Sequence, residues 1–128
     1  MRRVLAASVV AAGALASCAA PRQTLGTRSN VCFRSLPTAR AAVREEGRLV
    51  GVRLASRAHL LKAFPSATLP AGRDFCVVAF SDDFHVEKVQ HAAGAPAGKY
   101  AVVIVTMRGT TVVQTFLVDR VPLHLRHR

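Results

Sequence analysis

The sequence predicts an α+β fold: a single small domain with a mostly antiparallel, twisted sheet of about five or six strands and two short helices on one face. Three observations predict it. Once a short leader is set aside, the 128-residue chain has the size of one domain with one core. Short valine-rich stretches alternate or run continuously apolar, which is typical of strands. Two other segments, which end at Gly47 and Pro65, place apolar residues at helical spacing.

The first residues have the order of an export signal. Arg2 and Arg3 precede an apolar run over residues 4–15, and small residues follow before a cysteine. The run is shorter than the roughly 20 apolar residues that a spanning helix needs. We therefore expect residues 1–17 to be a signal peptide and the protein to be exported to the cell envelope.

The residues Leu15, Ala16, Ser17 and Cys18 resemble the lipobox of bacterial lipoproteins. The resemblance implies that Cys18 receives a diacylglyceryl group and becomes the first residue of a membrane-anchored protein. Residues 18–30, polar and rich in small side chains, would then form a flexible tether ahead of a domain over residues 31–128. Ordinary secretory cleavage near residues 14–16 is the alternative, and neither the membrane nor the leaflet is fixed by the sequence.

Cysteine parity favours lipidation. The chain has three cysteines, and an exported protein tends to pair them or to use the remaining one for a special purpose. With Cys18 holding lipid, Cys32 and Cys76 form an even pair that an oxidising compartment lets persist as a disulfide. The bridge would contribute roughly 4 kcal/mol by the chain-entropy estimate.

The first half of the domain is predicted to run in the order strand, helix, strand, helix. Residues 31–35 alternate, and Ser35 with Pro37 offers a cap and a first-turn proline for a helix to about Glu46. A strand follows over residues 49–54. Ser56 can then cap a second helix, whose core-facing residues would be Leu60, Leu61 and Phe64.

The second half is predicted to consist of strands. Residues 75–80 are continuously apolar, as in a central strand covered on both faces, whereas residues 84–90 alternate, as in a strand nearer an edge. Residues 100–107 and 110–118 flank Arg108 and Gly109, which predicts a hairpin with a two-residue turn. Residues 121–125 offer a last short strand.

Both faces of the predicted hairpin are apolar, and two helices on one side of the sheet cover only one of them. The second face must be buried by curling of the sheet, by a loop or by a partner. The residues expected to contact a protein partner are Val103, Val105, Val112 and Phe116.

The charge is strongly basic, with a formal net charge of +11. One tyrosine and no tryptophan leave little for base stacking, so nucleic acid is not an expected partner. Anionic lipid or an acidic envelope polymer suits arginine better. The candidate anion-binding residues are Arg40, Arg44, Arg48 and Arg53.

Asp83, His85 and Glu87 occupy alternate positions and would share one face of a strand. Carboxylate and imidazole groups at that spacing are candidate ligands for a divalent metal, so a metal-dependent or hydrolytic envelope enzyme is an alternative function. Solvated strand faces show the same pattern, and no HExxH, CxxC, P-loop or G-x-S-x-G motif accompanies it. No catalytic residue and no cofactor is therefore assigned.

Two segments resemble the C-terminal domain of bacterial protease-complex proteins of the B-subunit type, over about residues 55–125. The first is the strand-like run Asp74-Phe75-Cys76-Val77-Val78-Ala79-Phe80, and the second is Gly98-Lys99-Tyr100, which leads into a valine-rich strand and a hairpin. Gly98-Lys99-Tyr100 departs from the direct Gly-Tyr pair of those domains. The resemblance implies a non-enzymatic envelope accessory domain that binds a protein partner. The sequence thus favours a lipid-anchored binding module.

Overall fold

The computed structural model describes residues 31–108 and 111–121. The expected signal peptide and tether, Cys18, and residues 122–125 of the expected last strand lie outside the described residues. Residues 31–35, expected to be a strand, instead contain a turn and the 3-10 helix η1 (Phe33–Ser35). The remaining elements are α2 (Leu36–Ala42), β1 (Arg48–Ser56), α3 (Arg57–Ala63), β2 (Asp74–His85), η2 (Val86–Lys88), β3 (Ala92–Gly94), β4 (Ala97–Thr106) and β5 (Val112–Val118).

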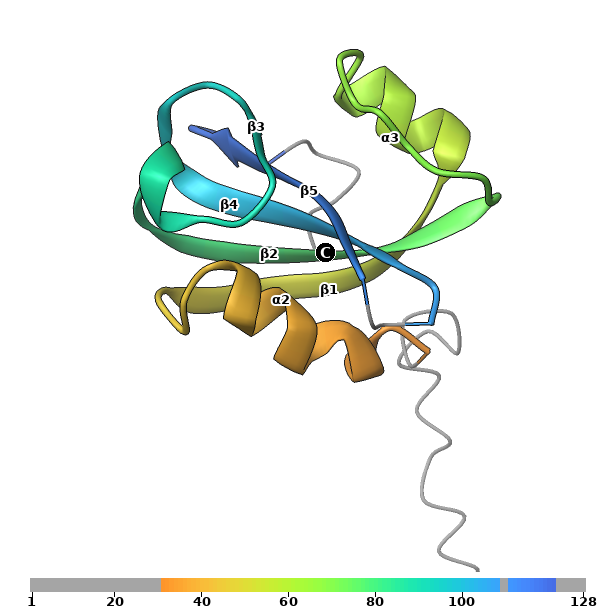
Figure 1. Cartoon of the computed structure of the whole chain (residues 1–128), viewed down its shortest axis with the longest axis horizontal. Coiled ribbons are helices and arrows are strands. Elements are labelled where there is room, and N and C mark those ends of the chain that lie inside the picture. The colour runs from red at the N-terminus through yellow and green to blue at the C-terminus, as the bar shows by residue number, and fades with distance from the viewer. Residues whose placement is uncertain (1–30, 109–110, 122–128) are drawn as a thin grey trace, which may run out of the picture.

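The strands form one five-stranded sheet in the order β1-β2-β4-β5-β3 (Figure 1). Neighbouring strands are antiparallel except β3 and β5, which are parallel. The predicted α+β class and the antiparallel character of the sheet are confirmed. The apolar run at residues 75–80 lies in β2, between β1 and β4, and is buried throughout, which agrees with the expected central strand.

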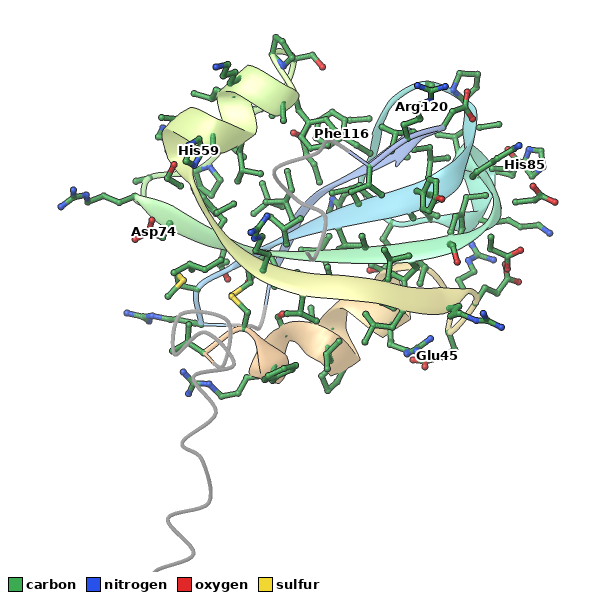
Figure 2. All side chains as sticks on the ribbon, turned by 180° about the vertical axis from the view of Figure 1, so that it is seen from behind. Glu45, His59, Asp74, His85, Phe116 and Arg120 are labelled. Atoms are coloured by element: carbon green, nitrogen blue, oxygen red, sulfur yellow. A yellow bond between two sulfur atoms is a disulfide. The ribbon has the colours of Figure 1, made fainter. Side chains whose placement is uncertain are left out.

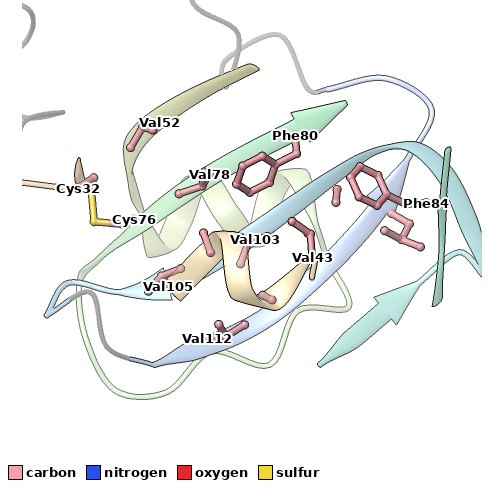
Figure 3. Packing of buried hydrophobic residues seen from close by; sticks show 14 residues of the cluster. Cys32, Val43, Val52, Cys76, Val78, Phe80, Phe84, Val103, Val105 and Val112 are labelled. Carbon is pink, nitrogen blue, oxygen red and sulfur yellow. A yellow bond between two sulfur atoms is a disulfide. The ribbon is translucent and has the colours of Figure 1, made fainter. Parts of the chain in front are cut away.

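The two helices lie on opposite faces of the sheet, which differs from the expected placement on one face (Figure 1). Along β2 the side chains alternate between two cores: Val78 packs in a cluster with Ala39 and Ala42 of α2, and Val77 packs in a cluster with Leu60 of α3. Each helix therefore covers one apolar face. Figure 3 shows the α2 cluster, which also contains the two sulfur atoms of Cys32 and Cys76.

Helix α2 begins where expected and ends earlier. Pro37 occupies its first turn, but the helix stops at Ala42 and not near Glu46, because Arg44 and Glu45 have φ of 54° and 60°. Gly47 has φ of 88°, a conformation that glycine adopts without steric cost. A Cβ on Gly47 would lie 2.8 Å from Cζ of Phe84. The chain thus reverses tightly against the sheet before β1 begins.

Helix α3 confirms the predicted cap. The Ser56 hydroxyl accepts a hydrogen bond from the His59 backbone N–H at 3.2 Å, which satisfies one of the free donors of the first turn. Leu60 is fully buried, and the Phe64 ring stacks on Phe116 with centroids 4.5 Å apart. The side chain of Leu61, also expected to face the core, is 38% exposed, since a helix of only seven residues presents a narrow apolar stripe to the sheet.

Candidate functional site

Cys32 and Cys76 form a disulfide, as the cysteine count predicts. Their Cα atoms lie 5.3 Å apart, and both residues are fully buried. The hydroxyl of Ser35 donates a hydrogen bond to the carbonyl oxygen of Cys32, and this bond holds the turn in which Cys32 lies. Because Cys76 belongs to β2, the bridge fastens the point at which the chain enters the domain to the central strand.

The expected partner-contact residues of the hairpin are core residues. Val103 and Val105 are fully buried, and Val112 and Phe116 are 9% and 3% exposed. Val103, Val105 and Val112 pack in the α2 cluster, and Phe116 packs in the α3 cluster. In the folded domain the two helices cover both faces of the hairpin, so these four side chains lie inside the domain and not on its surface.

A β-bulge explains why Phe116 lies on the other face of the sheet from Val103, Val105 and Val112. The register changes between Ile104, which pairs with Gln114, and Val105, which pairs with Val112, so Val113 is an extra residue. One extra residue transfers all later side chains to the other face. The side chain of Phe116 therefore lies on the α3 face of the sheet, whereas that of Val112 lies on the α2 face. The expected two-residue turn is also longer, since β4 ends at Thr106 and β5 begins at Val112.

The row of Asp83, His85 and Glu87 does not form a metal site. β2 ends at His85, and Glu87 belongs to the 3-10 helix η2, so the alternation that would have aligned the three side chains stops after the second. The pairing of β2 with β4 is also irregular between Ser81 and Phe84. Among the described residues, no group of three or more His, Cys, Asp or Glu side chains could hold a metal ion.

The four arginines expected to bind anions do not share one surface. Arg40 is half-buried, donates a hydrogen bond from its guanidinium to the Gly47 carbonyl at 3.0 Å and lies 5.0 Å from the centroid of the Phe80 ring. It therefore stabilises the turn after α2. Arg44 follows that helix, whereas Arg48 and Arg53 pair with Ser81 and Val77 across β1 and β2, on the α3 face of the sheet.

Arg57 has a structural role that the sequence did not indicate. Its guanidinium donates hydrogen bonds to the carbonyl oxygens of Leu69, Pro70 and Gly72. These bonds hold the loop between α3 and β2 against the start of α3. An arginine near other arginines gives no signal for such a role, because the three acceptors are backbone atoms twelve to fifteen residues away.

An open depression of about 560 Å³ lies between α2, the segment after η2 and the start of β5. Its lining mixes small apolar groups with hydroxyl, amide and imidazole side chains and contains no carboxylate. His91 at its rim has φ of 50°, and its carbonyl accepts a hydrogen bond from Thr115 N–H at 2.9 Å. The lining residues are Pro37, Thr38, Ala41, Gln90, His91, Thr111 and Val112.

The outer edge of the sheet offers a different kind of site. β1 spans Arg48–Ser56 and, among the residues described, pairs only with β2, so its other edge faces no strand (Figure 1). The pairing with β2 is irregular between Leu49 and Gly51, and the extra residue Val50 is 38% exposed. Residues 51–56 then pair regularly with β2. An edge of this length can accept one added strand from another chain.

None of the helices in the described residues is long and apolar enough to cross a membrane. Comparison of the chain with protein-family models, with curated proteins and with solved structures gave no match.

Proposed function

We propose that this protein is a lipid-anchored accessory domain of a bacterial cell envelope, attached to a membrane through Cys18, and that it binds a protein partner. The observation that carries the proposal is the Cys32–Cys76 disulfide. Structural disulfides persist in oxidising compartments outside the cytoplasm. The bond therefore supports export, which the order of charged, apolar and small residues before Cys18 predicts.

The same bond supports the assignment of Cys18. With Cys32 and Cys76 joined and buried, Cys18 is the third cysteine of the chain, and it stands at the end of the lipobox-like run Leu15-Ala16-Ser17. Lipidation at this position would leave no free thiol in the mature chain. This agrees with the rule that an odd cysteine in an exported protein has a special use.

The free edge of β1 is the surface that best fits a protein partner. Arg48 and Arg53 lie on this edge strand, so an acidic extended segment would complement it. The resemblance of residues 55–125 to an accessory domain of envelope protease complexes agrees with a protein partner.

Intact-mass measurement of the protein extracted from membranes tests the anchor. We expect loss of residues 1–17, addition of acyl chains and loss of two hydrogens. A Cys18→Ser variant is the matched control and should leave the membrane fraction with no acyl mass. Recovery of unprocessed chain with three reduced cysteines would contradict the proposal.

Site-specific photo-cross-linking in intact cells tests the partner surface. A photoreactive amino acid at Val50, on the edge strand, is compared with the same amino acid at Leu61, on α3, because both native side chains are 38% exposed. We expect an adduct with an envelope protein from position 50 and not from position 61. Equal labelling, or no adduct at position 50, would remove β1 as the contact.

A further inference from the structure

The end of the domain at which the chain enters combines exposed apolar and cationic side chains. Val31 and Phe33 are 36% and 47% exposed, and Met107 is 36% exposed. Arg34, Arg73 and Arg108 are exposed as well. We call this the entry end, and its described members are Val31, Phe33, Arg34, Arg73, Asp74, Met107 and Arg108.

The disulfide and the pairing of β2 with β4 bring these residues together. Cys32, next to Phe33, is bonded to Cys76, and Cys76 pairs with Val105 of β4. Met107 lies two residues beyond Val105, or about 7 Å further along the chain. Figure 1 agrees, because the β4–β5 connection lies beside the start of the helical segment that leads into α2.

The charges of the domain are divided between its two ends. The entry end contains one acidic residue, Asp74, and three arginines, Arg34, Arg73 and Arg108. The other six acidic residues of the chain lie at the opposite end, as Figure 2 shows for Glu45 relative to Asp74. They follow α2, occupy the end of β2 and η2, or follow β5, and they are Glu45, Glu46, Asp82, Asp83, Glu87 and Asp119.

Basic residues at that opposite end nearly balance the acids. Arg44 lies in the turn after α2, Arg48 pairs with Ser81, and Arg120 follows β5. Lys88 and Lys99 lie beside the end of β2. An anionic surface therefore attracts the entry end and not the opposite end.

Attachment at Cys18 holds the same end close to the bilayer. Residues 19–30 separate Cys18 from Val31, and a chain of that length spans at most about 45 Å. Exposed aromatic and thioether side chains beside arginines suit the boundary between headgroups and acyl chains, where the apolar groups enter and the guanidinium groups meet phosphate.

From this arrangement, and resting on the proposed anchoring at Cys18, we propose that the entry end of the domain contacts the surface of an anionic phospholipid bilayer. Phe33 and Met107 then insert at the interface, and Arg34 and Arg108 contact lipid phosphates. This orientation leaves the acidic end, with Asp83 and His85, directed away from the membrane.

A tryptophan reporter tests this contact in the full chain, which has no tryptophan of its own. Phe33→Trp is compared with Val86→Trp, which places the reporter at a 36% exposed site in η2 at the opposite end. Each variant is extracted from membranes and reconstituted into vesicles of phosphatidylethanolamine and phosphatidylglycerol with brominated acyl chains. We expect several-fold stronger quenching and a shorter emission wavelength for Phe33→Trp.

Two further measurements make the outcome decisive. Charge reversal by Arg34→Glu with Arg108→Glu should reduce the quenching at position 33, whereas the control pair Arg44→Glu with Arg120→Glu should not. In vesicles of pure phosphatidylcholine, the quenching at position 33 should be weaker than in the anionic vesicles. Acylated protein that shows equal quenching at positions 33 and 86 overturns the contact alone. An intact mass without acyl chains overturns the anchoring on which it rests.

Discussion

Replacing Thr115 with valine should stabilise the domain. Thr115 is fully buried, and its hydroxyl is the one buried side-chain oxygen or nitrogen in the described residues that has no hydrogen-bond partner. A buried polar group without a partner costs about 1–3 kcal/mol. Valine has nearly the same shape, keeps the β-branch that suits β5 and removes the hydroxyl. We expect the free energy of unfolding to rise by about 1 kcal/mol and Tm by roughly 4–8 °C.

Urea unfolding followed by far-ultraviolet circular dichroism measures the change, since a small domain of this kind should unfold in a two-state transition. Thr111→Val is the matched control. Thr111 is exposed, so its substitution should change stability by less than about 0.5 kcal/mol. If Thr115→Val instead lowers stability by about 1 kcal/mol or more, the hydroxyl has a partner in solution and the reasoning fails.

Three further predictions follow from the core and the turns. Replacing Cys32 and Cys76 together by alanine should lower the free energy of unfolding by roughly 2–5 kcal/mol in urea titrations, and reduction of the native protein should lower Tm in the same direction. Val103→Asp places a charge at a fully buried site and should abolish cooperative unfolding. The control Val50→Asp, at a 38% exposed site, should change the free energy of unfolding by less than about 0.5 kcal/mol. A well-folded Val103→Asp protein would mean that this face of the hairpin is accessible to a partner. Gly47→Ala should lower the free energy of unfolding, measured by calorimetry, by roughly 2 kcal/mol or more. The reason is that Gly47 has φ of 88° and that a Cβ there would lie 2.8 Å from the Phe84 ring. Unchanged stability would mean that the turn can rearrange to accept the methyl group.

Local signals in the sequence predicted the elements that depend on neighbouring residues. Ser56 caps α3 as expected because a cap needs only a hydroxyl and a donor two or three residues later. The continuous apolar run at residues 75–80 identified the central strand because only a strand covered on both faces has no polar side. The Cys32–Cys76 pair followed from counting cysteines.

Features set by register and by packing across the fold were not predictable in the same way. The bulge at Val113 has no sequence signal, yet it decides which face Phe116 occupies. The placement of α2 and α3 on opposite faces depends on how each connection crosses the sheet, which periodicity does not report. The expectation that Asp83, His85 and Glu87 share one face of a strand is wrong for a related reason, because the alternation continues in the sequence after the strand has ended at His85.

The bridge between Cys32 and Cys76 also determines how the domain resists a pulling force. A pull on residue 31 is passed through covalent bonds to β2, which is held by hydrogen bonds to β1 on one side and to β4 on the other. The intervening segment, which contains α2, β1 and α3, has its ends clamped 5.3 Å apart between Cα atoms. A pull on the N-terminal side of the domain cannot extend that segment until the sulfur–sulfur bond is reduced.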